Sequence, residues 1–157
     1  MIESFSLNVN GKTRTITTDG ESPLLYILRN DFALNGPKFG CGLAQCGACA
    51  VLANGIEIRS CVTPISQVGE RKIVTAEGLG TVEHPSSLQA AFIVEQAAQC
   101  GYCTSGMTIA ATALLKQHPK PNHAQIVAGM DGHLCRCGTY LRIASAIERA
   151  SKGSVHE

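Results

Sequence analysis

Residues 40–49 of the chain read GCGLAQCGAC, and a fourth cysteine follows after eleven further residues. The C-x4-C-x2-C spacing of the first three cysteines is that of plant-type [2Fe-2S] sites, whereas zinc ribbons and fingers usually present paired CxxC knuckles. Three glycines in this stretch suit a curled loop, because such a loop needs positive φ angles or positions without a side chain. The backbone amides of such a loop stabilise negative charge. The three glycines are Gly40, Gly42 and Gly47. The candidate ligands of this first iron-sulfur site are Cys41, Cys46, Cys49 and Cys61.

A second group of four cysteines follows the cysteine-free stretch 62–99. Its CxxC and CxC pairs could hold zinc, but the two thiolates of a CxC can also reach a compact two-iron cluster. Because the first group already has [2Fe-2S] spacing, the second group is also expected to be a [2Fe-2S] site. A Rieske centre would need two histidine ligands, and no histidine has that paired spacing. The candidate ligands of the second site are Cys100, Cys103, Cys135 and Cys137. The histidines are expected to be structural or solvated: His84, His118, His123, His133 and His156.

Composition excludes several function classes. The 157 residues suffice for one domain or two small ones, and 45% apolar against 16% charged residues favour a packed core over disorder. Because 13 basic and 12 acidic residues leave a net charge of +1, we expect no nucleic-acid partner. No apolar stretch is long enough for a spanning helix, and no export signal is visible, so we expect no direct membrane insertion and no disulfide scaffold.

The N-terminal part reads as a small α+β domain covering residues 1–78. Asn10-Gly11 and Asn54-Gly55 each separate two short strand patterns and predict tight type I′ hairpin turns. Ser22 is expected to cap a short helix that carries Pro23 at its first position and an apolar stripe over 24–28. The expected strands are 2–9, 13–17, 50–53, 56–58 and 73–75.

The C-terminal part, residues 82–153, reads as four helices because its apolar residues recur every three or four positions. The cysteines of the second group lie between these helices, and antiparallel packing could bring them to one end of a bundle, where the positive N-terminal dipole of the second helix would face the anionic cluster. The first expected helix starts at Ser86 or Ser87 and ends near 98, and the second runs over 104–117. The third starts with a capping box of Asn122 and Gln125 and ends near 132, and the fourth runs over 140–151.

No nucleotide-binding or hydrolytic motif is present, and Gly78 and Gly80 read as a linker. The cysteine motifs, with QCGYCTSGM at 99–107 and LCRC at 134–137, resemble those of the iron-sulfur (small) subunits of the molybdenum hydroxylases, the xanthine oxidase family. This family includes xanthine and aldehyde oxidoreductases and carbon monoxide dehydrogenase. The resemblance covers essentially the whole chain and implies a ferredoxin-like β-grasp [2Fe-2S] domain followed by a four-helix-bundle [2Fe-2S] domain.

The resemblance also implies a role and partners. The chain would be the electron-transfer subunit of an oxidoreductase whose substrate chemistry, oxidation of an aldehyde or N-heteroaromatic compound, takes place on a molybdopterin-binding large subunit. The second site would lie nearest the molybdopterin, in its cytosine dinucleotide form, with Gln99 and Cys137 as pterin contacts. From spacing alone, Gln99 could equally be a helix-end side chain with a satisfied amide. Arg136 could raise a nearby cluster potential or pair with the partner.

Some residues depart from the common family pattern. Many relatives have proline at Ser105, asparagine at His133 and Thr-Gly where this chain has Gly138-Thr139. The runs LRN at 28–30, NGPK at 35–38 and CRCGTY at 135–140 look more like the two-subunit branch. That branch comprises isoquinoline 1-oxidoreductase, nicotinate dehydrogenase and related aldehyde dehydrogenases, and often lacks a flavin subunit. The next electron acceptor could therefore be a cytochrome c or FAD.

Two other functions stay open from the sequence: a free-standing [2Fe-2S] carrier and a zinc-stabilised interaction module. The near-neutral charge and the helical domain argue against a free carrier, which is usually acidic. Cluster assembly favours a cytoplasmic location, although a partner's twin-arginine signal could export a folded complex.

Overall fold

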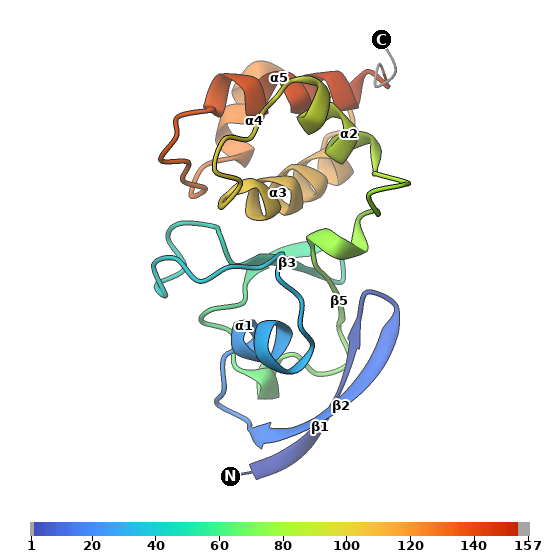
Figure 1. Ribbon diagram of the computed structural model, residues 1–157, viewed down its shortest axis with the longest axis vertical. Helices are drawn as coiled ribbons and strands as arrows, with labels where there is room; N and C mark the ends of the chain where they lie inside the picture. The colour runs from blue at the N-terminus through green and yellow to red at the C-terminus, as the bar shows by residue number, and fades with distance from the viewer. Residues whose placement is uncertain (1, 154–157) are drawn as a thin grey trace.

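The computed structural model describes residues 2–153, so the expectation for His156 lies outside the described residues. Its N-terminal part is a five-stranded mixed sheet of order β2-β1-β5-β3-β4, in which β1 and β5 pair in parallel and the other neighbours are antiparallel (Figure 1). The strands are β1 Ile2–Val9, β2 Lys12–Asp19, β3 Ala50–Ala53, β4 Ile56–Arg59 and β5 Lys72–Val74.

Both predicted hairpin turns are confirmed. Asn10 and Gly11 have φ angles of 50° and 76°, and Asn54 and Gly55 have 51° and 81°. Positive φ at both central residues defines the type I′ turn, which matches the twist of the flanking strands.

The helix of the N-terminal domain begins differently from the prediction. Helix α1 (Leu24–Tyr26) continues as a π-helical segment, η1 (Ile27–Asp31), and Pro23 rather than Ser22 is its N-cap, without a side-chain cap. The predicted Ser22 cap is wrong because the Ser22 carbonyl accepts a hydrogen bond from the Ile65 amide (2.9 Å), at the start of the short 3-10 helix η2 (Ile65–Gln67). A tertiary hydrogen bond therefore keeps the backbone at Ser22 outside the helix.

The C-terminal domain contains four helices: α2 Ser87–Val94, α3 Thr104–Gln117, α4 His123–Gly129 and α5 Tyr140–Ser151. Ser86 and Asn122 complete capping boxes with Gln89 and Gln125, as the sequence indicates. Helix α2 ends earlier than predicted because Gln96 adopts a left-handed φ of 48°, which stops the helix. Helix α4 likewise ends at Gly129 rather than near 132.

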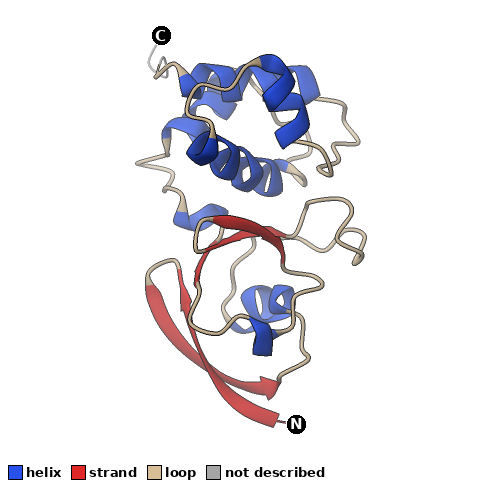
Figure 2. Ribbon diagram, turned by 180° about the vertical axis from the view of Figure 1, so that it is seen from behind, coloured by secondary structure: helices blue, strands red, loops and turns tan. Residues whose placement is uncertain are grey.

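Strand β3 joins the two domains. All four of its residues are buried, and they alternate between two cores. Val51 and Ala53 pack in the core beneath the sheet, whereas Ala50 and Leu52 pack against α3. Figure 2 shows α3 lying across the part of the sheet formed by β3 and β4. A short 3-10 helix, η3 (Ala76–Gly78), precedes the connection to α2.

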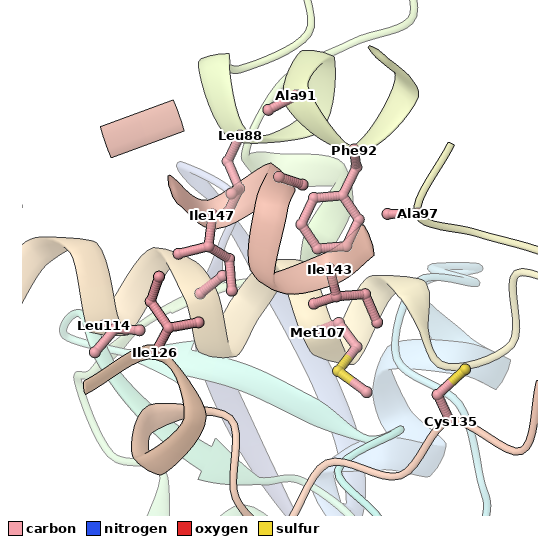
Figure 3. Packing of buried hydrophobic residues seen from close by; sticks show 12 residues of the cluster. Leu88, Ala91, Phe92, Ala97, Met107, Leu114, Ile126, Cys135, Ile143 and Ile147 are labelled. Atoms are coloured by element: carbon pink, nitrogen blue, oxygen red, sulfur yellow. The ribbon is translucent and has the colours of Figure 1, made fainter. Parts of the chain in front are cut away.

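The helical domain has its own core, to which α2, α3, α4 and α5 all contribute. Met107, Ile143 and Ile147 form its centre, and Figure 3 shows Cys135 at its edge. The α+β architecture with a β-grasp domain and a helical bundle is thus confirmed. Within residues 2–153, no helix has the length and apolar character needed to cross a membrane.

Candidate metal centres

The first cysteine loop curls around the sulfur of Cys41. The amides of Leu43, Gln45 and Cys46 donate to Cys41 Sγ over 3.3, 3.2 and 3.4 Å. These hydrogen bonds, of which that from Leu43 has the largest effect, lower the pKa of the Cys41 thiol to about 7 despite some desolvation. The loop is therefore built to stabilise a thiolate and other negative charge next to it.

The three loop glycines have the properties that the sequence suggests. Gly42 and Gly47 have φ angles of 67° and 77°. Gly40 has an ordinary φ, but a Cβ there would lie 2.6 Å from Cys46 Sγ, so the backbone must approach the sulfur closely. Ala44 also adopts a positive φ, 60°, which no sequence signal indicated.

The β3–β4 hairpin brings Cys49 next to Cys61. Cys49 immediately precedes β3, Cys61 follows β4, and Ala50 pairs with Arg59 at the open end of the hairpin. The two Sγ atoms lie 3.2 Å apart, and Ser60 Oγ donates to the Cys49 carbonyl over 2.7 Å. Burial raises the pKa of the Cys49 thiol to about 12, so this thiol needs a bound cation to become thiolate.

The second site lies between the α2–α3 and α4–α5 connections. The thiol of Cys100 interacts with that of Cys137, and the thiol of Cys103 with that of Cys135. Burial raises the pKa of Cys103 to about 12. Burial also acts to raise the pKa of Cys135, but hydrogen bonds led by the Thr139 hydroxyl (3.3 Å) bring it down to about 7. Helix α3 begins directly after Cys103, so its positive N-terminal dipole lies at this site, as expected.

The eight thiols thus meet in pairs. Within the described chain, no three Cys, His, Asp or Glu side chains converge closely enough to surround a single metal ion. A [2Fe-2S] cluster has two irons with two thiolates at each, so two pairs per site fit it better than they fit one four-thiolate zinc ion. The pairs are Cys41 with Cys46, Cys49 with Cys61, Cys100 with Cys137, and Cys103 with Cys135.

The two sites adjoin each other. The Leu134 amide donates to the Cys46 carbonyl over 3.0 Å, which links a residue next to Cys135 with a cysteine of the first site. Helix α3 approaches the first loop so closely that a Cβ on Gly106 would lie 2.2 Å from the Gly47 carbonyl oxygen.

The other predicted site residues lie at the surface. Gln99 is exposed beside Cys100, Cys137 is half-buried, and Arg136 is exposed between two cysteines. Gln99 and Arg136 are therefore accessible to a partner protein, and Cys137 is partly accessible.

His133 is a structural histidine, as expected from the sequence, but the sequence did not reveal its contact partner. It is 4% exposed, and its Nε2 lies 2.8 Å from Glu57 Oε1. Burial, with a further contribution from Arg59, lowers the pKa of His133 to about 4, so the imidazole is neutral near pH 7. The one available signal was its position two residues before Cys135.

Comparisons with known proteins agree with two cluster-binding domains. A family described as "2Fe-2S iron-sulfur cluster binding domain" matches residues 7–73, and one described as "[2Fe-2S] binding domain" matches residues 75–148. A nicotinate dehydrogenase subunit of Pseudomonas putida is 49% identical over 152 residues, 97% of each chain.

Two other relatives have similar coverage. The alpha subunit of isoquinoline 1-oxidoreductase from Brevundimonas diminuta is 53% identical over 145 residues, which make up 92% of this chain and 95% of the relative. A crystal structure of quinoline 2-oxidoreductase from Pseudomonas putida 86 matches with a TM-score of 0.91 and 35% identity, over 98% of this chain and 96% of that one.

Proposed function

Since this chain belongs to the iron-sulfur subunits of the molybdenum hydroxylase family, we propose that it conducts electrons from a molybdopterin-binding large subunit to an external acceptor. Family membership makes the chain part of an oxidoreductase complex and gives it two [2Fe-2S]-binding domains. A [2Fe-2S] cluster, when bound, accepts and releases one electron at a time. The observation that carries the proposal is the meeting of eight thiols as two adjoining sets of two pairs.

We assign four cysteines to each cluster. The amides around Cys41 and the hydroxyl of Thr139 stabilise thiolate charge at the two sites, whereas the buried thiol of Cys49 and the part-buried thiol of Cys103 would release their protons on binding iron. The first set is Cys41, Cys46, Cys49 and Cys61, and the second is Cys100, Cys103, Cys135 and Cys137.

We place the two sites in separate domains, 1–78 and 82–153. The division is supported by the hydrophobic cores, because the core beneath the sheet draws on residues 7–73 and the helical core on residues 88–147. Each set of residues thus buries its own apolar surface, which is the mark of a domain.

The second site is proposed to face the large subunit. Gln99 and Cys137 would contact the pterin, in its cytosine dinucleotide form, because both side chains are accessible at that end of the bundle. The related proteins act on nicotinate, isoquinoline and quinoline by name, so we propose an N-heteroaromatic compound, or an aldehyde, as the substrate of the complex. The acceptor beyond the first site would be a cytochrome c or FAD, and the complex would reside in the cytoplasm.

The proposal is tested on the complex purified from its native source. We expect molybdenum and a large subunit to co-purify with the chain, about four irons per chain, and two distinct EPR signals after reduction. Cys49→Ser should remove the first signal alone and Cys135→Ser the second alone, so each variant serves as the control of the other. A fully loaded complex with one signal would refute the two-cluster assignment, and isolation of the chain without a partner would make it a free carrier. A heme stain and a flavin assay identify the acceptor.

A further inference from the structure

A part-buried polar network lies where the two cysteine loops meet. His133 is the one buried histidine among residues 2–153, and its ring covers Gly47, where an added Cβ would lie 2.2 Å from Nδ1. Its Nε2 contacts Glu57 Oε1 over 2.8 Å. His133 thus reaches from the second cysteine loop across the first loop to strand β4.

Arg59 joins the same two loops from β4. Its Nε donates to the Ala44 carbonyl over 3.3 Å, and its Nη2 donates to the Gly132 carbonyl over 3.2 Å. Glu57 and Arg59 are two apart on β4 and form an ion pair, so both point to one face of the strand. The carboxylate of Glu57 therefore orients both His133 and Arg59.

These contacts surround the hydrogen bond between the loops. Gly132 and His133 immediately precede Leu134, whose amide donates to Cys46, while Ala44 and Gly47 lie on either side of Cys46. The apolar contact of β3 with α3 already attaches the domains. Because apolar burial has no direction, it tolerates sliding, whereas hydrogen bonds with defined geometry specify one position.

We propose that His133, Glu57 and Arg59 are positioning residues that fix the two cysteine loops relative to each other and thereby set the spacing and electron exchange between the two clusters. The inference rests on the proposed function, because it assumes that both sites hold clusters. It concerns only the relative position of the loops, since none of the three side chains is assigned as a ligand.

The test uses His133→Ala and Glu57→Gln in the assembled complex. EPR of the fully reduced complex measures the magnetic splitting between the clusters, which falls with the cube of their distance, and hydrogen exchange measures opening at residues 130–135. We expect both variants to keep both signals, lose part of the splitting, and exchange about 10- to 100-fold faster in this segment, as for loss of a hydrogen bond to a charged group.

Two further variants separate positioning from general destabilisation. Glu95→Gln removes a carboxylate from another part-buried ion pair, with Arg149 at 2.6 Å, and should leave the splitting unchanged. His133→Gln retains a side-chain donor for Glu57 and should restore most of the splitting.

Wild-type splitting and exchange in both His133→Ala and Glu57→Gln would overturn the inference. Loss of a whole EPR signal in either variant would also overturn it, because these residues would then be needed for cluster binding rather than for spacing. A single signal in the unmodified complex would instead refute the two-cluster function.

Discussion

Replacing Gly47 with alanine should destabilise the loaded protein through two separate effects. Gly47 is buried between Cys46 and Cys49 and has a φ of 77°, which L-residues with a Cβ rarely adopt. The new Cβ would also lie 2.2 Å from Nδ1 of His133, a ring held in place by Glu57. Either the ring or the loop must therefore move.

The magnitude follows from these two effects. A left-handed φ costs a residue with a Cβ about 1–2 kcal/mol. Overpacking a well-filled site typically costs a further 1–3 kcal/mol, so we expect a total of about 2–5 kcal/mol. Gly69→Ala is the matched control, because Gly69 has a φ of 58° but no atom within 4 Å of an added Cβ. It should show the conformational effect alone.

Thermal loss of the visible cluster absorbance provides the assay. In a chain of this length, an overpacking effect of about 1–3 kcal/mol separates the midpoints of the two variants by about 2–12 °C. Midpoints are compared at equal iron content and scan rate, because unfolding of a metal-loaded protein is not strictly two-state. Adding His133→Ala should remove most of the difference, since it deletes the ring that the new methyl group meets.

Equal midpoints for Gly47→Ala and Gly69→Ala would refute this reasoning. They would mean that His133 does not occupy the space above Gly47 in solution. Strict additivity between Gly47→Ala and His133→Ala would lead to the same conclusion, because residues in contact are expected to couple.

Further predictions concern stability and use the same assay. Gly106→Ala should lower the midpoint although alanine favours a helix interior by about 1 kcal/mol, because its Cβ would meet the Gly47 carbonyl at 2.2 Å; a higher midpoint would contradict that contact. Ser86→Ala should cost about 1 kcal/mol through loss of the α2 cap, and Ser87→Ala less than about 0.5 kcal/mol; equal effects would argue against the cap. Ile109→Ala should cost about 2–5 kcal/mol because its side chain is fully buried between α3 and β3, and a neutral result would mean that the domains separate there.

The elements that the sequence predicted well are those fixed by local chemistry. An Asn-Gly pair can take two consecutive positive φ angles, so both hairpin turns could be located. The capping residues Ser86 and Asn122 satisfy amides within their own first turn, which makes them recognisable without any tertiary information.

The errors arise where distant segments determine the local structure. Ser22 has a side chain typical of an N-cap, but its backbone carbonyl pairs with the amide of Ile65, 43 residues away in the chain. The early end of α2 depends on Gln96, a residue with no special preference for a left-handed φ. Neither position has a local signal strong enough to reveal its backbone conformation.

The cysteine sites also have one part that the sequence could predict and one part that it could not. The spacing of the cysteines identified two groups, because several ligands of a cluster come from one short loop. Which thiols pair depends on how loops pack, and the His133–Glu57 contact joins residues 76 positions apart. Such a contact could not be expected from one sequence, since a buried histidine and an exposed one look alike there.

Strand β3 explains why this small protein can hold two sites at a defined separation. A strand covered on one face alternates apolar and polar residues, whereas the AVLA sequence of β3 is apolar throughout because Val51 and Leu52 serve different cores. The same backbone that leads directly from Cys49 therefore forms part of the domain interface. Movement between the domains would disturb both cores and the ligand loop together. The apolar contact therefore restricts separation of the domains, whereas the directional contacts of His133 and Arg59 restrict sliding. A relay of fixed length requires both restrictions, and neither alone would provide it.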